Sequence, residues 1–290
     1  MVSRAAITPR ARFVLPTLRD PRVTLSVLLT LYTVLGQTVL YFNRDIKQLL
    51  LCVGTSCAIE IALSFIFTRV LLFPISAYIT GLSIGLLLES YDARVFVLAS
   101  LWGISSKYFI RDRQGHFFNP SNFAVVSALV LSHGLATVAP GSQWGGKAWI
   151  PIVILVLGTT MMYRVKRIDL VGAWFSGYVL MGLLRMMLGQ GGLVFALGPM
   201  LSGEFALFSF SMLPDPKTSP NTRTGRILWG AGIALTDGTL RYFEIRYSMF
   251  FALFAFCALL PVFRRVFGGN RRESEPWKTI ERPLGVSSTA

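Results

Sequence analysis

Ten apolar stretches follow one another along this chain of 290 residues, and they constrain its fold more than any other feature. They cover residues 22–42, 48–68, 70–89, 94–110, 117–138, 148–163, 168–188, 192–213, 225–243 and 247–266. Apolar runs of about this length cross a bilayer as helices, because a helix satisfies its own backbone hydrogen bonds in lipid. The sequence therefore predicts an all-α integral membrane protein with about ten transmembrane helices.

The composition points the same way. Hydrophobic residues make up 53% of the chain, charged residues only 14%, and the mean hydropathy is +0.58. This is too little charge to coat a soluble protein of this size. The formal net charge of +14 is scattered between the apolar runs and forms no basic stripe with interleaved aromatics, so we expect the lipid bilayer, and no nucleic acid, as the partner.

Cysteine and histidine offer no framework for a metal or a disulfide. The three cysteines lie inside apolar stretches and form no Cys-x-x-Cys pair, which argues against structural disulfides and a cysteine-ligated cluster. The two histidines, His116 and His133, are too few and too peripheral for a haem held by two histidines. We expect no metal site.

Glycine and proline mark irregular spans. The fourth, sixth and ninth stretches are short or interrupted by glycine, which predicts discontinuous or tilted segments. The eighth contains Gly198, Pro199 and Gly203, which suggests a re-entrant segment. Gly81 and Gly85 in the third form a small-xxx-small step, for which close helix packing is favoured over ligand contact.

Basic residues predict the orientation. With the N-terminus inside, inner segments hold 21 of the 28 Lys and Arg residues and outer ones hold six, while Arg185 lies within a span. This bias predicts that both termini lie in the cytoplasm, around a multi-pass domain in the membrane. The divisions are a basic N-terminal segment (1–21), the transmembrane domain (22–266) and a polar tail (267–290) that we expect to be disordered.

Segment 212–226, between the eighth and ninth apolar stretches, combines prolines with cations. Pro214 and Pro216 stop the preceding helix around Asp215, and Ser219–Pro220 reads as the N-cap and first residue of the next helix, with Thr222 and Thr224 as alternative caps. Three cations lie beside these helix-start donors: Lys217, Arg223 and Arg226. This predicts an anion site; a basic turn that only sets topology is the alternative.

A second segment, 107–123, has the same design. Asn119 followed by Pro120 predicts the start of the fifth span, and Lys107, Arg111 and Arg113 precede it. The charge count puts this helix start on the same face as Asp215. Convergent helix N-termini hold anionic groups in membrane folds; two unrelated, well-capped spans are the alternative.

Ionisable residues within spans are costly and therefore informative. Asp237 and Arg241 lie four residues apart on one helix and are candidates to pair. We expect Arg185 and Glu204 to be a second pair, between the seventh and eighth spans. Glu60 has no evident local partner, so it is the candidate for a proton relay, with a hydrogen-bonded structural role as the alternative.

Three segments, 76–88, 107–123 and 210–229, together resemble the RnfD/NqrB family of membrane subunits. They contain Ser-x-x-x-Thr-Gly-x-x-x-Gly-Leu-Leu-Leu, Phe-Asn-Pro-x-x-Phe and Asp-Pro-x-Thr-Ser-Pro-x-Thr-x-x-Gly-Arg, in the family's order from about residue 22 to 266. Segments 106–123 and 139–145 are most similar to the RnfD-like, UnbU-type membrane proteins of enediyne biosynthetic clusters. The resemblance implies a ten-helix fold and flavin-borne electron transfer across the membrane, with FMN or riboflavin.

Two departures limit this resemblance. The family attaches FMN through a threonine in a Ser-Gly-Ala-Thr type motif, which is missing here; the corresponding connection, 140–147, reads Pro-Gly-Ser-Gln-Trp-Gly-Gly-Lys. Pro214 also replaces the small hydroxyl residue usual before Asp-Pro. We therefore expect a non-covalent flavin rather than covalent FMN. The residues expected to line its site are Lys107, Arg111, Arg113, Asn119, Asp215, Lys217, Thr218, Arg223 and Arg226.

The leading hypothesis is thus an RnfD-like electron-transfer protein, with other membrane redox subunits as partners and an enediyne-type biosynthetic pathway as its setting. A transporter or channel for a small polar solute is the first alternative, since broken helices that meet at proline-marked sites suit that role as well. A structural subunit that holds a redox partner is the second. The catalytic residues, if any, stay unassigned.

Overall fold

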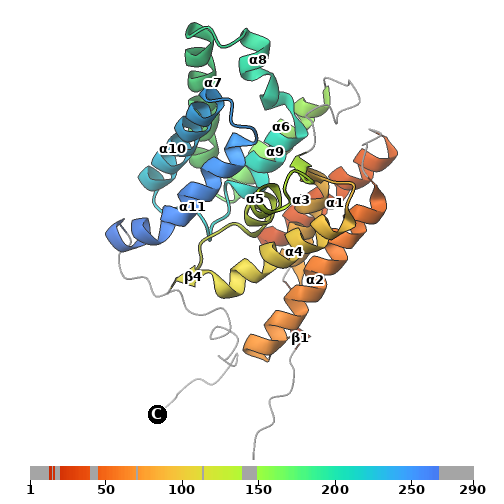
Figure 1. The fold of residues 1–290 in the computed structure, drawn as a ribbon. Helices are drawn as coiled ribbons and strands as arrows, with labels where there is room; N and C mark the ends of the chain where they lie inside the picture. Colours follow the sequence, from red (N-terminus) through yellow and green to blue (C-terminus); the bar gives the residue numbers. More distant parts are fainter. Residues whose placement is uncertain are drawn as a thin grey trace, which may run out of the picture.

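The computed structural model describes residues 13–14, 16, 20–39, 45–69, 71–112, 114–138 and 149–267 (Figure 1). The fold is all-α, with eleven α-helices among these residues. They are α1 (Pro21–Thr38), α2 (Ile46–Thr68), α3 (Ile75–Leu87), α4 (Ala93–Phe109), α5 (Pro120–Leu131), α6 (Trp149–Arg164), α7 (Ile168–Met187), α8 (Leu193–Leu197), α9 (Gly203–Leu207), α10 (Arg223–Tyr242) and α11 (Ser248–Phe267). Each of the ten predicted stretches contains a helix. The tail from residue 268 onward lies outside the described residues.

Short polar side chains set where several helices begin. Asp20, Asp45 and Asp92 each accept a hydrogen bond from the backbone N–H two residues later, at the starts of α1, α2 and α4. Asn119 does the same for α5, through the N–H of Asn122. These caps satisfy N–H groups that a helix leaves unpaired in its first turn.

Three two-stranded ladders join the helix ends. β1 (Phe13–Val14) pairs in parallel with β2 (Leu71–Leu72), and β3 (Leu88–Glu89) pairs antiparallel with β6 (Thr137–Val138). β4 (Arg111–Asp112) and β5 (Gly115–His116) form an antiparallel hairpin between α4 and α5. The chain leaves α3 and α5 through β3 and β6, so these two short helices end next to one another.

The two halves of the chain pack in the same order. In the first, α2 contacts α3 and α4, and α4 contacts α5; in the second, α7 contacts α8 and α10, and α10 contacts α11. The halves meet through α5 and α11. Figure 1 shows the red-to-yellow first half beside the green-to-blue second half. The resulting bundle has two ends, at which the helix connections gather.

Three helices are long and apolar enough to span a membrane: Ile46–Thr68, Ile168–Met187 and Ser248–Arg265. A fourth candidate is the pair Leu193–Leu201 and Gly203–Met212, which is bent by 58° at Ser202. This pair comprises α8, the 3₁₀ turn η1 (Gly198–Leu201), α9 and the π-helical turn η2 (Phe208–Met212). A break in the eighth stretch is therefore confirmed. By length and composition, this is a multi-pass membrane protein.

Most of the other expected irregularities were wrong or lay elsewhere. α4, α6 and α10 are each uninterrupted, although they contain glycine. A Cβ at Gly230 in α10 would collide with the Leu170 carbonyl of α7, so this glycine permits close packing and breaks nothing. α6 is short, as predicted, with 16 residues, and α3 and α5 are shorter still, with 13 and 12 residues.

The small-xxx-small step packs α3 onto α2, as predicted. A Cβ at Gly81 would lie 2.6 Å from Val53 Cα, and one at Gly85 would lie 3.0 Å from Leu49 Cα. Only glycine allows the two backbones to approach so closely. α3 is accordingly among the most buried helices of the bundle.

Candidate functional site

The candidate site lies at the end of the bundle where residues 107–119, 164–169 and 213–226 meet, which we call the basic face. These three connections are far apart in the sequence, and side-chain contacts between them define the face. It contains all the predicted site residues that the structure describes. Arg113 lies outside the described residues.

Asn119 and Asp215 join two of the predicted segments. The Asn119 Nδ2 donates to Asp215 Oδ2 over 3.2 Å and to the Met212 carbonyl over 3.3 Å, while its Oδ1 accepts from the Asn122 N–H. Asp215 Oδ1 accepts from the Lys217 N–H at 3.0 Å. The prediction that both segments lie on one face is confirmed, and Asn119 also satisfies a carbonyl at the end of η2.

The start of α10 differs from the first prediction. Thr222 is the N-cap, accepting a hydrogen bond from the Gly225 N–H at 3.1 Å, so Ser219–Pro220 as cap and first helical residue was wrong and the Thr222 alternative was right. The Ser219 hydroxyl is engaged elsewhere: it donates to the Asp215 carbonyl at 2.8 Å and accepts from Arg167 at 3.1 Å. The loop thus folds on itself before the helix begins.

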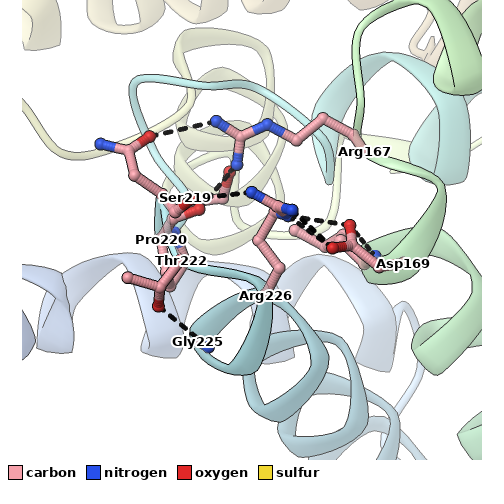
Figure 2. A network of polar contacts seen from close by, with 9 residues as sticks. Arg167, Asp169, Ser219, Pro220, Thr222, Gly225 and Arg226 are labelled. Atoms are coloured by element: carbon pink, nitrogen blue, oxygen red, sulfur yellow. Dashed lines mark hydrogen bonds and ion pairs between the residues drawn. The ribbon is translucent and has the colours of Figure 1, made fainter.

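Arg226 is held by the protein itself (Figure 2). Its Nε and Nη2 donate to the Asp169 carboxylate over 2.8 and 2.5 Å, and its Nη1 donates to the Asn221 carbonyl over 2.7 Å. This is a two-point contact between a guanidinium and a carboxylate, the strongest geometry for such a pair. Arg226 therefore fastens the start of α10 to the start of α7.

Arg167 extends this network to residues 219–221 of the loop. Its Nη1 donates to Ser219 Oγ and to the Pro220 carbonyl, and its Nη2 donates to Asn221 Oδ1 at 3.2 Å. The side chain is only 6% exposed, and this burial lowers the pKa of Arg167, with Arg226 nearby acting in the same direction. Sequence reasoning assigned no role to Arg167 or Asp169; their position directly before and within the first turn of the seventh stretch was the available signal.

Arg264 of α11 connects the β4–β5 hairpin with the loop. Its Nη1 donates to both Asp112 carboxylate oxygens over 3.0 Å, and its Nη2 donates to the Lys217 carbonyl over 2.5 Å. Arg264 was not predicted as a site residue, because it lies more than 45 residues from either partner along the chain. The hairpin and the loop are therefore fixed relative to one another.

His116 lies within the basic face and was not predicted as a site residue. Burial lowers its pKa well below the usual range, and four cations act in the same direction: Lys217, Lys107, Arg264 and Arg111. The imidazole is consequently neutral at physiological pH. Neutral His116 is able to accept a hydrogen bond from a ligand that lies between these cations, or to donate one to it.

Glu60 finds its partner 47 residues away. Lys107 Nζ in the last turn of α4 lies 2.5 Å from Glu60 Oε2 and 3.3 Å from Ser76 Oγ, and both charged side chains are 9% exposed. The charge of each is balanced by the other. The structure thus supplies the partner that the sequence did not reveal, and Lys107 is engaged inside the protein.

The remaining predicted residues differ in their surroundings. Arg223 is exposed at the start of α10, and Lys217 and Arg111 are exposed with contacts of their own. Thr218 is 1% exposed, and its hydroxyl has no hydrogen-bond partner among the described residues. A buried hydroxyl without a partner is unusual in a native protein.

A different charged cluster lies at the opposite end of the bundle. Arg241 Nε and Asp237 Oδ2 pair at 2.9 Å, which confirms the predicted i, i+4 contact. The expected pair of Arg185 with Glu204 was wrong: no ion pair or hydrogen bond joins them. Each of them lies near the Asp237–Arg241 pair instead.

These contacts test whether the basic face suits a flavin. Lys217, Arg111 and neutral His116 offer positive charge and a polar ring nitrogen, and Thr218 offers an unpaired hydroxyl, so this part fits a phosphate or the oxygen-rich edge of a flavin. Arg226 and Arg167 do not fit, because their donors already bind protein groups. Among the described residues, no group of three or more His, Cys, Asp or Glu side chains is placed to hold a metal ion.

Comparison with known proteins adds no further assignment. Neither protein-family models nor curated proteins match this chain.

Proposed function

We propose that this chain is an RnfD-like membrane protein with about ten transmembrane helices, which takes part in electron transfer across a bacterial cytoplasmic membrane and holds FMN or riboflavin without a covalent bond. The basic face would be cytoplasmic, as the distribution of Lys and Arg favours. Other membrane redox subunits would be its partners. The resemblance to enediyne-cluster proteins supports a role in a biosynthetic pathway.

The observation that carries this proposal is the hydrogen bond between Asn119 and Asp215. It joins two of the three segments on which the resemblance rests, although they are 96 residues apart. Segments that served only to set the orientation of the chain in the membrane would not need to contact one another. Their contact brings Lys217 and the buried Thr218 into the neighbourhood of His116.

The residues would have separate tasks. Lys217 and Arg111 would offset the negative charge of a phosphate or of a reduced flavin ring, and Asp215 would fix the loop through its own hydrogen bonds. Thr218 and His116 would hydrogen-bond the ring or the ribityl chain. A bound flavin would supply the redox chemistry. Arg226, Arg167 and Arg264 would keep the loop in place.

Flavin titration tests this proposal. Purified protein in detergent is titrated into FMN or riboflavin, and binding is read from quenching of flavin fluorescence. We expect Lys217→Gln to weaken FMN binding by roughly ten- to a hundredfold, the equivalent of one charge-assisted hydrogen bond. Lys166→Gln is the matched control, because Lys166 is exposed on the same face but outside the loop. Equal binding by both variants would refute the site.

Transport of a small polar solute is a second candidate, favoured by buried ion pairs near both ends of the bundle. Glu60–Lys107 lies toward the basic face and Asp237–Arg241 toward the opposite end, while α3 and α5 are too short to span. A colourless protein that equilibrates a solute across liposomes, and loses this ability in Glu60→Gln, would favour transport over electron transfer.

A further inference from the structure

Arg185 is a buried cation without a partner. It lies in the last turn of α7, at the end of the bundle opposite the basic face, and its side chain is 5% exposed. No described residue forms an ion pair or a hydrogen bond with it, and its Nε is fully buried. An isolated buried guanidinium is costly, so a missing anionic partner is the expected explanation.

The groups around Arg185 leave an excess of positive charge. Among the described residues, the ionisable side chains near enough to act on it are Arg241, Tyr178 and Asp237. Asp237 is already satisfied, because it accepts from Arg241 Nε at 2.9 Å and from the Ser248 hydroxyl at 2.6 Å. Asp237 is thus shared by two guanidinium groups, and the other carboxylate of this cluster, Glu204, acts on Arg241 and not on Arg185, so Arg185 has no carboxylate of its own.

Further donors in this cluster lack acceptors. The Tyr178 hydroxyl is buried and has no hydrogen-bond partner in the described part of the chain, and the Arg241 guanidinium carbon lies 5.1 Å from the centre of the Tyr178 ring. Tyr178 and Arg185 are seven residues apart and therefore lie on the same face of α7. Arg241 binds Asp237 through Nε, and its Nη groups bind no described residue. The Arg185 Nε, the Tyr178 hydroxyl and the Arg241 Nη groups therefore have no acceptor among the described residues.

We propose that Arg185 and Tyr178, beside the Asp237–Arg241 ion pair, form a binding site for a phosphate group. A tetrahedral oxyanion has enough oxygens for donors on three side chains, and its charge would balance Arg185. The site is independent of the flavin proposal, because it lies at the other end of the bundle. The phosphate belongs either to a lipid headgroup or to a small soluble ligand.

Glu204 is the internal competitor for this role. It lies on α9, near Arg241 and Asp237, but it is not among the groups that act on Arg185. If a small movement paired Glu204 with Arg185, no ligand would be needed. A phosphate site at Arg185 and an ion pair between Glu204 and Arg185 predict opposite effects of substituting these two residues on stability, so substitutions distinguish them.

Thermal unfolding of the full-length protein tests the site. In detergent, inorganic phosphate is titrated against chloride at constant ionic strength; in a second arm, nanodiscs of phosphatidylglycerol are compared with nanodiscs of a phosphate-free galactolipid. We expect phosphate, in one arm or the other, to raise the unfolding temperature of the native sequence. Arg185→Gln should weaken this response by roughly ten- to a hundredfold, and Arg185→Lys should retain part of it.

The controls give each result a meaning. Arg94→Gln should respond like the native protein, because Arg94 is an exposed arginine at the same end of the bundle, paired only with Asp92. Without phosphate, Arg185→Gln should be at least as stable as the native protein, and Glu204→Gln should bind phosphate at least as tightly as the native protein does.

A response in the detergent arm identifies a soluble ligand, and a response confined to the nanodisc arm identifies a lipid headgroup. Equal responses of Arg185→Gln and Arg94→Gln in both arms, or equal destabilisation by Arg185→Gln and Glu204→Gln without phosphate, would overturn the proposal.

Discussion

The substitution Arg226→Lys tests whether Arg226 stabilises the fold or binds a ligand. Lysine keeps the positive charge but offers a single point of contact, whereas Arg226 bridges Asp169 through two nitrogens and the Asn221 carbonyl through a third. The substitution therefore removes about two hydrogen bonds, at least one of them to a carboxylate. Because Arg226 and Asp169 keep only 16% and 14% of their side-chain surface exposed, solvent screens the pair only in part.

The expected cost follows from these contacts. A hydrogen bond to a charged group contributes roughly 1.5–3 kcal/mol, so after a reduction for partial exposure we expect Arg226→Lys to lower the free energy of unfolding by about 2 kcal/mol. The measurement is reversible unfolding in mixed micelles with increasing sodium dodecyl sulfate. Arg223→Lys is the matched control: this arginine is exposed at the start of the same helix, and we expect a change within about 0.5 kcal/mol.

A double-mutant cycle with Asp169→Asn shows whether the two side chains act as a pair. If they do, the double variant should lose about 1–2 kcal/mol less than the sum of the single variants. Unchanged stability in Arg226→Lys together with weaker flavin binding would refute this reasoning, because it would mean that the guanidinium serves a ligand rather than the loop.

Three further predictions follow from the described contacts. Glu60→Gln should destabilise the protein by about 3 kcal/mol by leaving Lys107 buried and unpaired, and Glu60→Gln with Lys107→Met should restore most of the loss; additive losses in the same unfolding assay would contradict the ion pair. His116 has a lowered pKa in the folded state, so only the unfolded chain takes up this proton as the pH falls below about 6.5. The free energy of unfolding should drop there by up to about 1.4 kcal/mol per pH unit. The pH profiles of the native protein and His116→Gln should therefore diverge below about pH 6.5 and run together above it. For orientation, reporters fused after Ala290 or between Arg164 and Arg167 should be active only as cytoplasmic fusions, and a periplasm-active fusion at either place would overturn the assigned topology.

The helices were predictable because they depend on local sequence. Long apolar runs place helices wherever they occur, and caps such as Asn119–Pro120 mark where one begins. Glycine misled the prediction for α10, since its effect depends on whether another backbone lies against it, which the sequence does not state. The 12-residue length of α5 was misjudged, because the predicted stretch 117–138 was extended across Ser132, His133 and Gly134, where the helix ends with two residues of positive φ.

Polar contacts were harder to predict because their partners come from distant segments. The neighbours Asp237 and Arg241 were paired correctly, whereas Glu60 and Lys107 were considered separately. Arg226 was expected to face a ligand, and only the fold places Asp169 in front of its guanidinium. Local spacing thus located the basic face, and the three-dimensional arrangement decides which of its cations bind the protein itself.

The absorbance spectrum of the purified, undenatured protein tests the central claim most directly. The account predicts flavin bands near the visible blue that leave with the supernatant when the protein is denatured, and a band without flavin fluorescence after denaturing electrophoresis. A fluorescent band would show that the flavin is covalent and that the attachment site was misjudged. A protein that is colourless as purified and fails to bind added FMN or riboflavin would contradict the electron-transfer proposal itself.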